Sequence, residues 1–245
     1  MIHPTTADRI RVTGPQAESY LQGQLSQDVA SLAPGAGTES LLLEPTGKMG
    51  FWLQVERTDA GFVLAVDAGQ GEAVLERLTR FKLRTKVDFD LEPAAAGGGA
   101  ETGDETLARV MAGRPRHGAE IVAGETIPAE LGQHLVDASV SFTKGCYTGQ
   151  ELVARIDSRG GNVPRHLRRV TFDAPDPSAL PAPGTELVAD GKVVGRLTSV
   201  TWSGERHGGV ALGYVARAID VPATLELAGV GPGVGPADVR GLRED

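Results

Sequence analysis

The hydrophobic pattern changes character once along this chain of 245 residues, at the glycine-containing stretch 158–164. Ahead of that stretch, strand-like alternation and helical spacing follow one another. One strand is expected at 8–12, a helix after Pro15, three strands within 40–66, and a second helix whose apolar stripe includes Val74. This order predicts an α+β domain rather than one built from strictly alternating strands and helices.

The sequence after this stretch consists of short apolar runs separated by turns rich in glycine, proline and aspartate. Asp190-Gly191 lies between two such runs, and Asp-Gly is a strong hairpin signal. Strands are expected within 187–202, 209–217 and 223–227. We therefore predict two domains, residues 1–163 and residues 164–245, the second being a small β-barrel.

Four connecting segments have less regular patterns. The alanine- and glycine-rich stretch 93–105 predicts a flexible loop, and the apolar run at 107–115 predicts a return to strand. Residues 131–156 have a helix-like sequence. The stretch 228–236 is as glycine-rich as a phosphate loop, but its two prolines remove amide donors and no Lys-Ser or Lys-Thr follows. We interpret it as a turn.

Charge and hydropathy narrow the environment in which the chain works. The formal net charge is −8 and the pI about 5.2, which argues against broad binding to nucleic acid or to anionic membranes. No apolar run approaches the roughly 18 residues that span a bilayer. The beginning of the sequence lacks the apolar core of a signal peptide. We expect a cytoplasmic protein with no direct nucleic-acid partner and no membrane partner.

Cys146 is the single cysteine of the chain. It cannot form an internal disulfide, and alone it cannot hold zinc or an iron–sulfur cluster, because such sites usually need about four ligands. No metal site is therefore expected. The five histidines fall in no recognisable motif, which disfavours a Cys–His hydrolase.

The residues around Cys146 predict a helix start. Thr148 and Glu151 have the spacing of a capping box, with Thr148 at the N-cap. Cys146 would then lie just ahead of a helix N-terminus, where the helix dipole and Lys144 would both favour a thiolate.

Each of these residues also has a purely structural interpretation. Cys146 could be a small buried hydrophobic residue beside the cap. Lys144 could be a solvated surface residue, and Tyr147 could pack in the core. Glu151 could do nothing but cap the helix, and Arg155 could simply pair with it one turn on.

The stretch Lys144–Glu151 resembles the K-G-C-Y-x-G-Q-E signature of the YgfZ folate-binding family. Three more stretches of the first domain are similar to motifs of that family. They are 20–28 (F-L-Q-G-Q-x-x-x-D), 44–48 (D-P-K-G-R) and 81–87 (Y-x-x-R-x-K-V). Thr46 departs from the usual basic residue. Residues 195–199 and 211–215 resemble the end of the barrel shared with the glycine-cleavage T-protein.

The resemblance implies a folate-binding, aminomethyltransferase-like fold with a C-terminal β-barrel and tetrahydrofolate as its cofactor. It implies a role in assembling or repairing iron–sulfur clusters, including those of tRNA-modifying enzymes, with iron–sulfur enzymes or assembly proteins as partners. Cys146 and Lys144 would carry the chemistry. The residue types that suit folate are found at Tyr147, Gln150, Glu151, Arg155, Gln22, Gln24, Lys48 and Arg84.

Two other functions stay open. The first is a folate-dependent one-carbon transferase like the glycine-cleavage T-protein, which depends on a catalytic aspartate in its N-terminal part. Asp28 and Asp67 are the candidates, and both are expected to be structural. The second is a binding module without chemistry. The cysteine signature favours the accessory protein over both.

Overall fold

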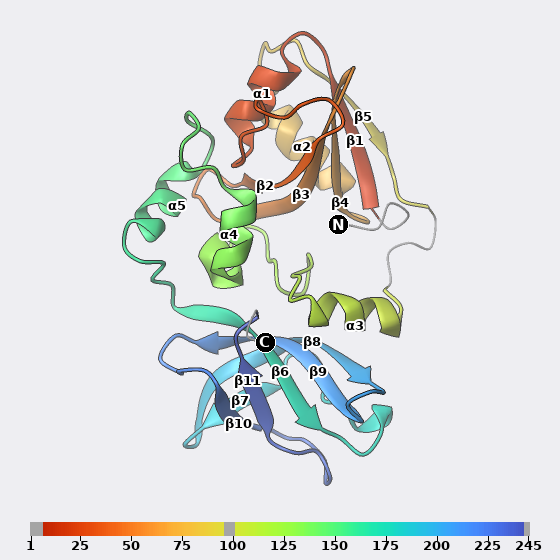
Figure 1. The fold of residues 1–245 in the computed structure, drawn as a ribbon, viewed down its shortest axis with the longest axis vertical. Coiled ribbons are helices and arrows are strands. Elements are labelled where there is room, and N and C mark those ends of the chain that lie inside the picture. Colours follow the sequence, from red (N-terminus) through yellow and green to blue (C-terminus); the bar gives the residue numbers. More distant parts are fainter. Residues whose placement is uncertain (1–6, 96–100, 243–245) are drawn as a thin grey trace. The chain divides into compact units, whose positions relative to one another are not determined.

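The computed structural model of the protein describes residues 7–95 and 101–242, which form two compact units (Figure 1). The first unit comprises the described residues up to 95 together with 121–129 and 133–161. The second comprises 101–120, 130–132 and 162–242. The predicted α+β class and C-terminal barrel are confirmed. Residues 101–120 group with the barrel by their contacts, which no pattern in the sequence had indicated.

The first unit is built on a five-stranded antiparallel sheet with strand order β2-β3-β4-β1-β5. Its strands are β1 (Ala7–Thr13), β2 (Gly37–Leu43), β3 (Met49–Thr58), β4 (Gly61–Asp67) and β5 (Asp88–Glu92). The first four lie where alternation predicted them. The fifth was not predicted, because its short alternating run follows a helix with no glycine or proline turn to mark it.

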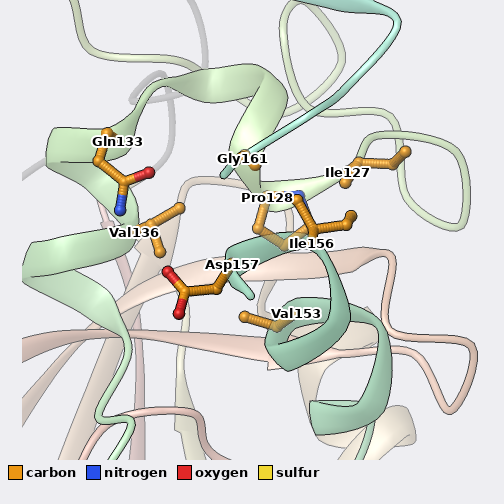
Figure 2. A pocket seen from close by; sticks show the side chains of 9 residues that line it. Ile127, Pro128, Gln133, Val136, Val153, Ile156, Asp157 and Gly161 are labelled. Carbon is orange, nitrogen blue, oxygen red and sulfur yellow. The ribbon is translucent and has the colours of Figure 1, made fainter. Parts of the chain in front are cut away.

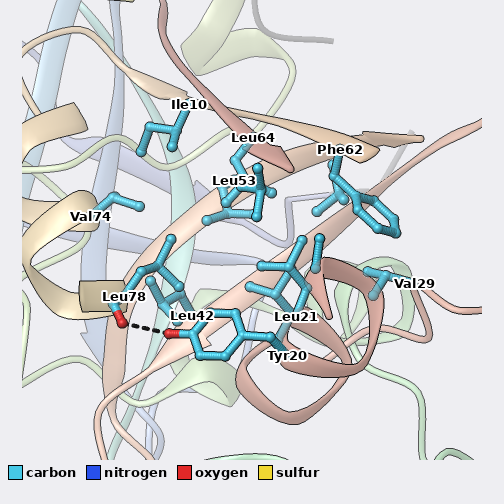
Figure 3. Packing of buried hydrophobic residues seen from close by; sticks show 14 of the residues in the cluster. Ile10, Tyr20, Leu21, Val29, Leu42, Leu53, Phe62, Leu64, Val74 and Leu78 are labelled. Carbon is cyan, nitrogen blue, oxygen red and sulfur yellow. Dashed lines mark hydrogen bonds between the residues drawn. The ribbon is translucent and has the colours of Figure 1, made fainter. Parts of the chain in front are cut away.

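Two helices, α1 (Ala17–Gln24) and α2 (Gly71–Lys82), pack against this sheet. Tyr20 and Leu21 of α1 and Leu78 of α2 are buried against alternate residues of the strands, and the Tyr20 hydroxyl donates to the Leu78 carbonyl (Figure 3). Full burial of such an apolar side chain contributes about 1.5–3 kcal/mol. The helical spacing predicted both helices correctly.

The remaining helices correct three predictions. They are α3 (Gly103–Met111), the 3-10 turn η1 (Pro128–Leu131), α4 (Gln133–Ser139) and α5 (Gln150–Asp157). The strand predicted at 107–115 is wrong, because Thr102 and Glu105 form a reciprocal capping box that starts α3. Within the predicted loop 93–105, residues 96–100 lie outside the described residues and 103–105 are helical. Residues 131–156 are not one helix, since 140–149 have no helical structure.

The second unit contains a closed six-stranded barrel of order β10-β11-β6-β9-β8-β7. Its strands are β6 (Arg165–Asp173), β7 (Glu186–Ala189), β8 (Lys192–Ser203), β9 (Gly208–Ala216), β10 (Ala223–Leu227) and β11 (Ala237–Arg240), with the 3-10 turn η2 (Pro177–Ala179). The Asp190-Gly191 hairpin is confirmed, with φ of 49° and 71° at its two turn residues. Residues 228–236 contain no helix, as the turn interpretation expected.

A buried polar cluster joins α3 to the barrel. The Glu120 carboxylate is fully buried and accepts hydrogen bonds from the hydroxyls of Thr198 and Ser199, both at 2.6 Å. Arg109 of α3 donates to the same carboxylate at 3.2 Å and to Ser199 at 2.9 Å. A buried carboxylate is tolerated only when it is paired in this way, so the cluster explains why 101–120 belong with the barrel.

The residue after α2 has a strained backbone. Leu83 has φ 47° and ψ −119° and is 90% exposed. A side chain in this region costs about 1–3 kcal/mol, and an exposed leucine recovers little of that by packing. We expect Leu83→Gly to raise the free energy of unfolding by about 1 kcal/mol in urea titrations, once the added freedom of the unfolded glycine is counted.

Arg84→Gly is the matched control for this substitution. Arg84 is the next residue, is also exposed, and is not among the residues with positive φ. Its replacement should lower the free energy of unfolding by roughly 0.5–1 kcal/mol. An equal loss of stability in both variants would show that Leu83 is not strained.

Candidate functional site

Residues 140–149, here called the signature loop, lie along residues 23–27 at the end of α1. Four backbone carbonyls of that segment accept hydrogen bonds from the loop. The Thr148 amide donates to Gly23 at 3.0 Å, the Ser141 amide to Ser26 at 3.0 Å, and Lys144 Nζ to Leu25 and Gln27, both at 2.8 Å. The two sequence motifs that are furthest apart in the first unit are therefore in direct contact.

Lys144 binds this segment from a partly buried position. Burial lowers the pKa of its ammonium group to about 8, and nearby Asp28 opposes that shift. The ammonium nitrogen also lies 5.4 Å from the centre of the Tyr147 ring. The interpretation of Lys144 as a solvated surface residue is wrong, because its ammonium group is committed to two protein carbonyls.

Cys146 is exposed, whereas its neighbour Tyr147 is buried. The interpretation of Cys146 as a buried hydrophobic residue is therefore wrong, and that of Tyr147 as a core residue is right. Burial raises the pKa of Tyr147 to about 12, so its hydroxyl stays protonated at neutral pH. The loop thus presents the thiol to solvent between the two residues that fix the loop, Lys144 and Tyr147.

The capping box predicted at Thr148 is not formed. The N-cap of α5 is Gly149, with φ 83° and no side-chain cap. Both the amide and the hydroxyl of Thr148 donate instead to the Gly23 carbonyl, at 3.0 and 3.4 Å. Glu151 is left exposed in the first turn of α5, and no ion pair in the described part of the chain joins it to the exposed Arg155.

Gly149 and Gly47 let the signature loop meet the turn 44–48 backbone against backbone. A Cβ on Gly149 would lie 2.6 Å from the Glu44 carbonyl oxygen. A Cβ on Gly47, which has φ 81°, would lie 2.6 Å from the Gly149 carbonyl and overlap Leu152. Glycine is required at both positions.

The side chains of Gln22 and Gln24 both form hydrogen bonds to other residues of the protein. The Gln22 amide nitrogen donates to Asp28 at 2.8 Å, and its oxygen accepts from the Val29 amide at 3.0 Å. The Gln24 oxygen accepts from Arg77 at 3.2 Å. These two predicted folate residues shape the segment that binds the signature loop.

The other predicted residues differ in how close they come to the loop. Gln150, the first residue of α5, contacts the loop directly, since its side-chain oxygen accepts from the Tyr147 amide at 3.3 Å. Lys48 is half-buried at the end of the turn that Gly149 touches. Arg84 is exposed beyond the end of α2, and no described contact links it to the loop.

Sequence reasoning missed Arg77, a buried residue of α2 that contacts both Gln24 and Leu43. A signal was available, because Arg77 falls between Val74 and Leu78 on the apolar stripe of that helix. A cation on an apolar stripe must be paired with buried polar groups, and here those groups support the signature loop.

A small pocket lies between α5 and α4 (Figure 2). Its lining is mainly apolar, and its polar side chains are Gln133 and Asp157. The apolar lining residues are Ile127, Pro128, Ala129, Val136, Val153 and Ile156. A pterin ring needs several convergent hydrogen-bond partners, so this pocket does not suit one.

Within residues 7–95 and 101–242, no group of three or more histidine, cysteine, aspartate or glutamate residues is placed to hold a metal ion. No helix in the same residues is long and apolar enough to cross a membrane.

Comparison with known proteins first defines the class. Residues 165–231 match the family model of the glycine cleavage T-protein C-terminal barrel domain. The structure of the chain is similar to that of aminomethyltransferase T of the glycine cleavage system from Bartonella henselae, with a TM-score of 0.74. The match covers 97% of this chain and 84% of that one at 19% sequence identity. The chain has the aminomethyltransferase fold.

Sequence relatives identify the family within that class. An uncharacterised protein of Haemophilus influenzae is 33% identical over 188 residues, which cover 62% of this chain and 67% of the relative. The tRNA-modifying protein YgfZ of Escherichia coli is 26% identical over 238 residues, with 72% of each chain covered. This chain belongs to the YgfZ-like folate-binding family, as the signature had indicated.

Gly149→Ala tests the close contact between the signature loop and the turn 44–48. A methyl group at φ 83° is strained and would also collide with the Glu44 carbonyl. We expect the free energy of unfolding to fall by about 2–4 kcal/mol, measured by urea denaturation. Gly145→Ala is the control, because a Cβ there meets nothing within 4 Å; its effect should stay within about 0.5 kcal/mol. Similar losses in both variants would rule out the proposed contact.

The lowered pKa of Lys144 predicts a pH dependence of stability. Its pKa is about 8 in the folded protein and ordinarily 10.5, so between these values the unfolded chain binds more protons. The contribution of Lys144 to stability should therefore rise as pH increases from 8 to 10.5 and be lowest below pH 8. The unfolding free energy of the wild type minus that of Lys144→Met should rise over this window. A flat difference would mean that the pKa is not lowered.

Proposed function

We propose that this protein binds tetrahydrofolate and supports the assembly or repair of iron–sulfur enzymes, including enzymes that modify tRNA. The observation that carries the proposal is the signature loop, which holds Lys144 and Tyr147 in place while leaving the Cys146 thiol exposed. Cys146 is exposed and is not part of the hydrophobic core described for the first unit. Membership of the YgfZ-like family supports the same function.

The start of α5 has the chemistry that a folate needs. Glu151 is an exposed carboxylate with no side-chain partner in the described part of the chain. Beside it, Gln150 uses its oxygen on the Tyr147 amide, which leaves its NH₂ group for a ligand. A carboxylate next to a carboxamide can pair with the N–H donors and carbonyl acceptor of a pterin.

Positive charge for the other end of the ligand is available on the same helix. Arg155 is exposed and lies one turn beyond Glu151. Its guanidinium group could bind the glutamate carboxylates of folate, because such pairs are often bidentate. We propose Glu151, Gln150 and Arg155 as ligand contacts, with Gln22 and Gln24 supporting the loop from behind. When bound, tetrahydrofolate would supply a carrier for one-carbon units.

The exposed thiol suits a protein that acts on another protein. A single cysteine cannot hold a cluster, so the partner would supply the remaining ligands or the cluster itself. Exposure is what a transient ligand or a redox thiol requires. The Lys144 ammonium is occupied by two carbonyls, so we propose that Lys144 positions the loop and does not act on substrate.

The alternative function is that of a folate-dependent one-carbon transferase. The structural likeness to aminomethyltransferase T motivates this alternative. Its catalytic aspartate would have to come from the first unit. Asp28, one of the two candidates, accepts a hydrogen bond from Gln22 and lies near Lys144, which is a structural role.

Titration of tetrahydrofolate into the reduced protein, followed by calorimetry, tests the proposal. We expect micromolar or tighter binding that Cys146→Ser changes less than about twofold, since the thiol is exposed and its replacement alters little volume. Glu151→Gln should weaken binding about tenfold, or 1.4 kcal/mol, while the free energy of unfolding falls by no more than about 1 kcal/mol, the usual contribution of a carboxylate in the first turn of a helix. Absence of binding by the wild type would overturn the folate site.

Complementation separates the accessory role from the transferase. In cells lacking the protein, the wild type should restore methylthiolation of tRNA, and Cys146→Ser should fail to restore it while folding normally. A Cys146→Ser variant that restores methylthiolation fully would contradict the role of the thiol. Release of methylene-tetrahydrofolate from an aminomethyl donor in vitro would favour the transferase instead.

A further inference from the structure

Arg77 is a charged residue buried within the first unit. It is 4% exposed and lies on α2 between the core residues Val74 and Leu78. Burying a guanidinium group is costly unless its donors are satisfied, so its partners show what the burial achieves.

The partners of Arg77 come from two segments that are far apart in sequence. Its Nη2 donates to the Leu43 carbonyl at 2.7 Å, at the end of β2. Its Nη1 donates to the Gln24 side chain at 3.2 Å, at the end of α1. The guanidinium carbon lies 4.0 Å from the centre of the Phe81 ring, which covers one face of the group.

The third nitrogen of the guanidinium group faces the turn 44–48. Arg77 Nε lies 4.0 Å from a Glu44 carboxylate oxygen and has no hydrogen-bond partner. Arg77 therefore contacts Leu43 directly and attracts the next residue, Glu44, by charge. Its side chain fixes the distance between the end of α1 and the beginning of this turn.

Both segments also bind the signature loop. The end of α1 offers the Gly23 and Leu25 carbonyls that accept from Thr148 and Lys144. The turn offers the Glu44 carbonyl against which Gly149 packs. The loop makes these contacts at once only if the two segments keep their spacing.

We propose that Arg77 is a positioning residue for the signature loop: by joining Gln24 to Leu43 and Glu44, it sets the spacing on which the placement of Cys146 and the start of α5 depends. The effect on ligand binding rests on the function proposed above. The effect on the loop itself does not.

The test compares Arg77→Met with Arg80→Met in the full-length protein. Arg80 lies one turn further along α2, is exposed, and within the described residues forms its ion pair with Glu76 on the same helix face, which makes it a matched control. Hydrogen exchange is followed at the Thr148 amide, which binds Gly23, and at the Gly47 amide, which binds Glu44 at 2.8 Å. Affinity for tetrahydrofolate is measured on the same samples.

We expect Arg77→Met to speed exchange at both amides by about tenfold or more and to weaken tetrahydrofolate binding about tenfold, while amides in β3 change less than twofold. Arg77→Lys, which can keep the bond to Leu43 but not all three contacts, should fall between Arg77→Met and the wild type. Arg80→Met should match the wild type. Should Arg77→Met fail to fold, Arg77→Lys gives the same comparison with a smaller expected change.

Two results would overturn the proposal. One is unchanged exchange at Thr148 and Gly47 in a folded Arg77 variant. The other is equal acceleration at these amides and in β3, which would mean that Arg77 only stabilises the unit as a whole. If the wild type does not bind tetrahydrofolate, the proposed function fails, and the exchange data still decide the role of Arg77.

Discussion

The site in the first unit depends on the way the signature loop binds the end of α1 and the residues that follow it. The last carbonyls of a helix have no partners within the helix, and they attract positive charge. Helix α1 has no basic residue in its last turn. Thr148, more than a hundred residues further along the chain, supplies a partner for one of these carbonyls, because its amide donates to Gly23 in the last turn of α1. Lys144 donates to the carbonyls of Leu25, the C-cap residue, and of Gln27 just beyond it, and so brings positive charge to this end of the helix. The rest of the site follows from these interactions, because a loop that binds residues 23–27 at several points has a fixed path.

The fixed path explains how Cys146 can be exposed while its backbone is held in place. Lys144 and Thr148 bind α1 on either side of it, Tyr147 is buried next to it, and Gly149 packs against the turn 44–48 immediately afterwards. The thiol is held at both ends by contacts that do not involve its own side chain. Conformational entropy has therefore already been lost in folding, and a ligand or partner that meets the thiol does not have to order the loop.

Much of the fold could be predicted from the sequence because most of its strands and its first two helices show clear periodicity, and Asp190-Gly191 marks its hairpin. The errors lie where a local signal competes with a distant one. Thr148 has the local pattern of an N-cap, but the Gly23 carbonyl takes both of its donors, so Gly149 becomes the cap instead. Gln22 and Gln24 have the right chemistry for folate, yet their partners are Asp28 and Arg77. Side-chain type can be read from sequence, whereas the direction in which a side chain points depends on contacts between distant segments.

The same distribution of contacts bears on the kind of chemistry that the chain can support. A nucleophilic cysteine usually has a base or a cation dedicated to its sulfur. Lys144 is the obvious cation, but its ammonium group is used to bind α1, and burial has already lowered its pKa to about 8. Moving it toward the sulfur would break two hydrogen bonds and release the loop. The Lys144 ammonium group therefore helps to position the loop that carries the thiol and does not contact the sulfur. A thiol that is exposed and held in place is accessible to a metal centre or an oxidant brought by another molecule, which agrees with the accessory role proposed above.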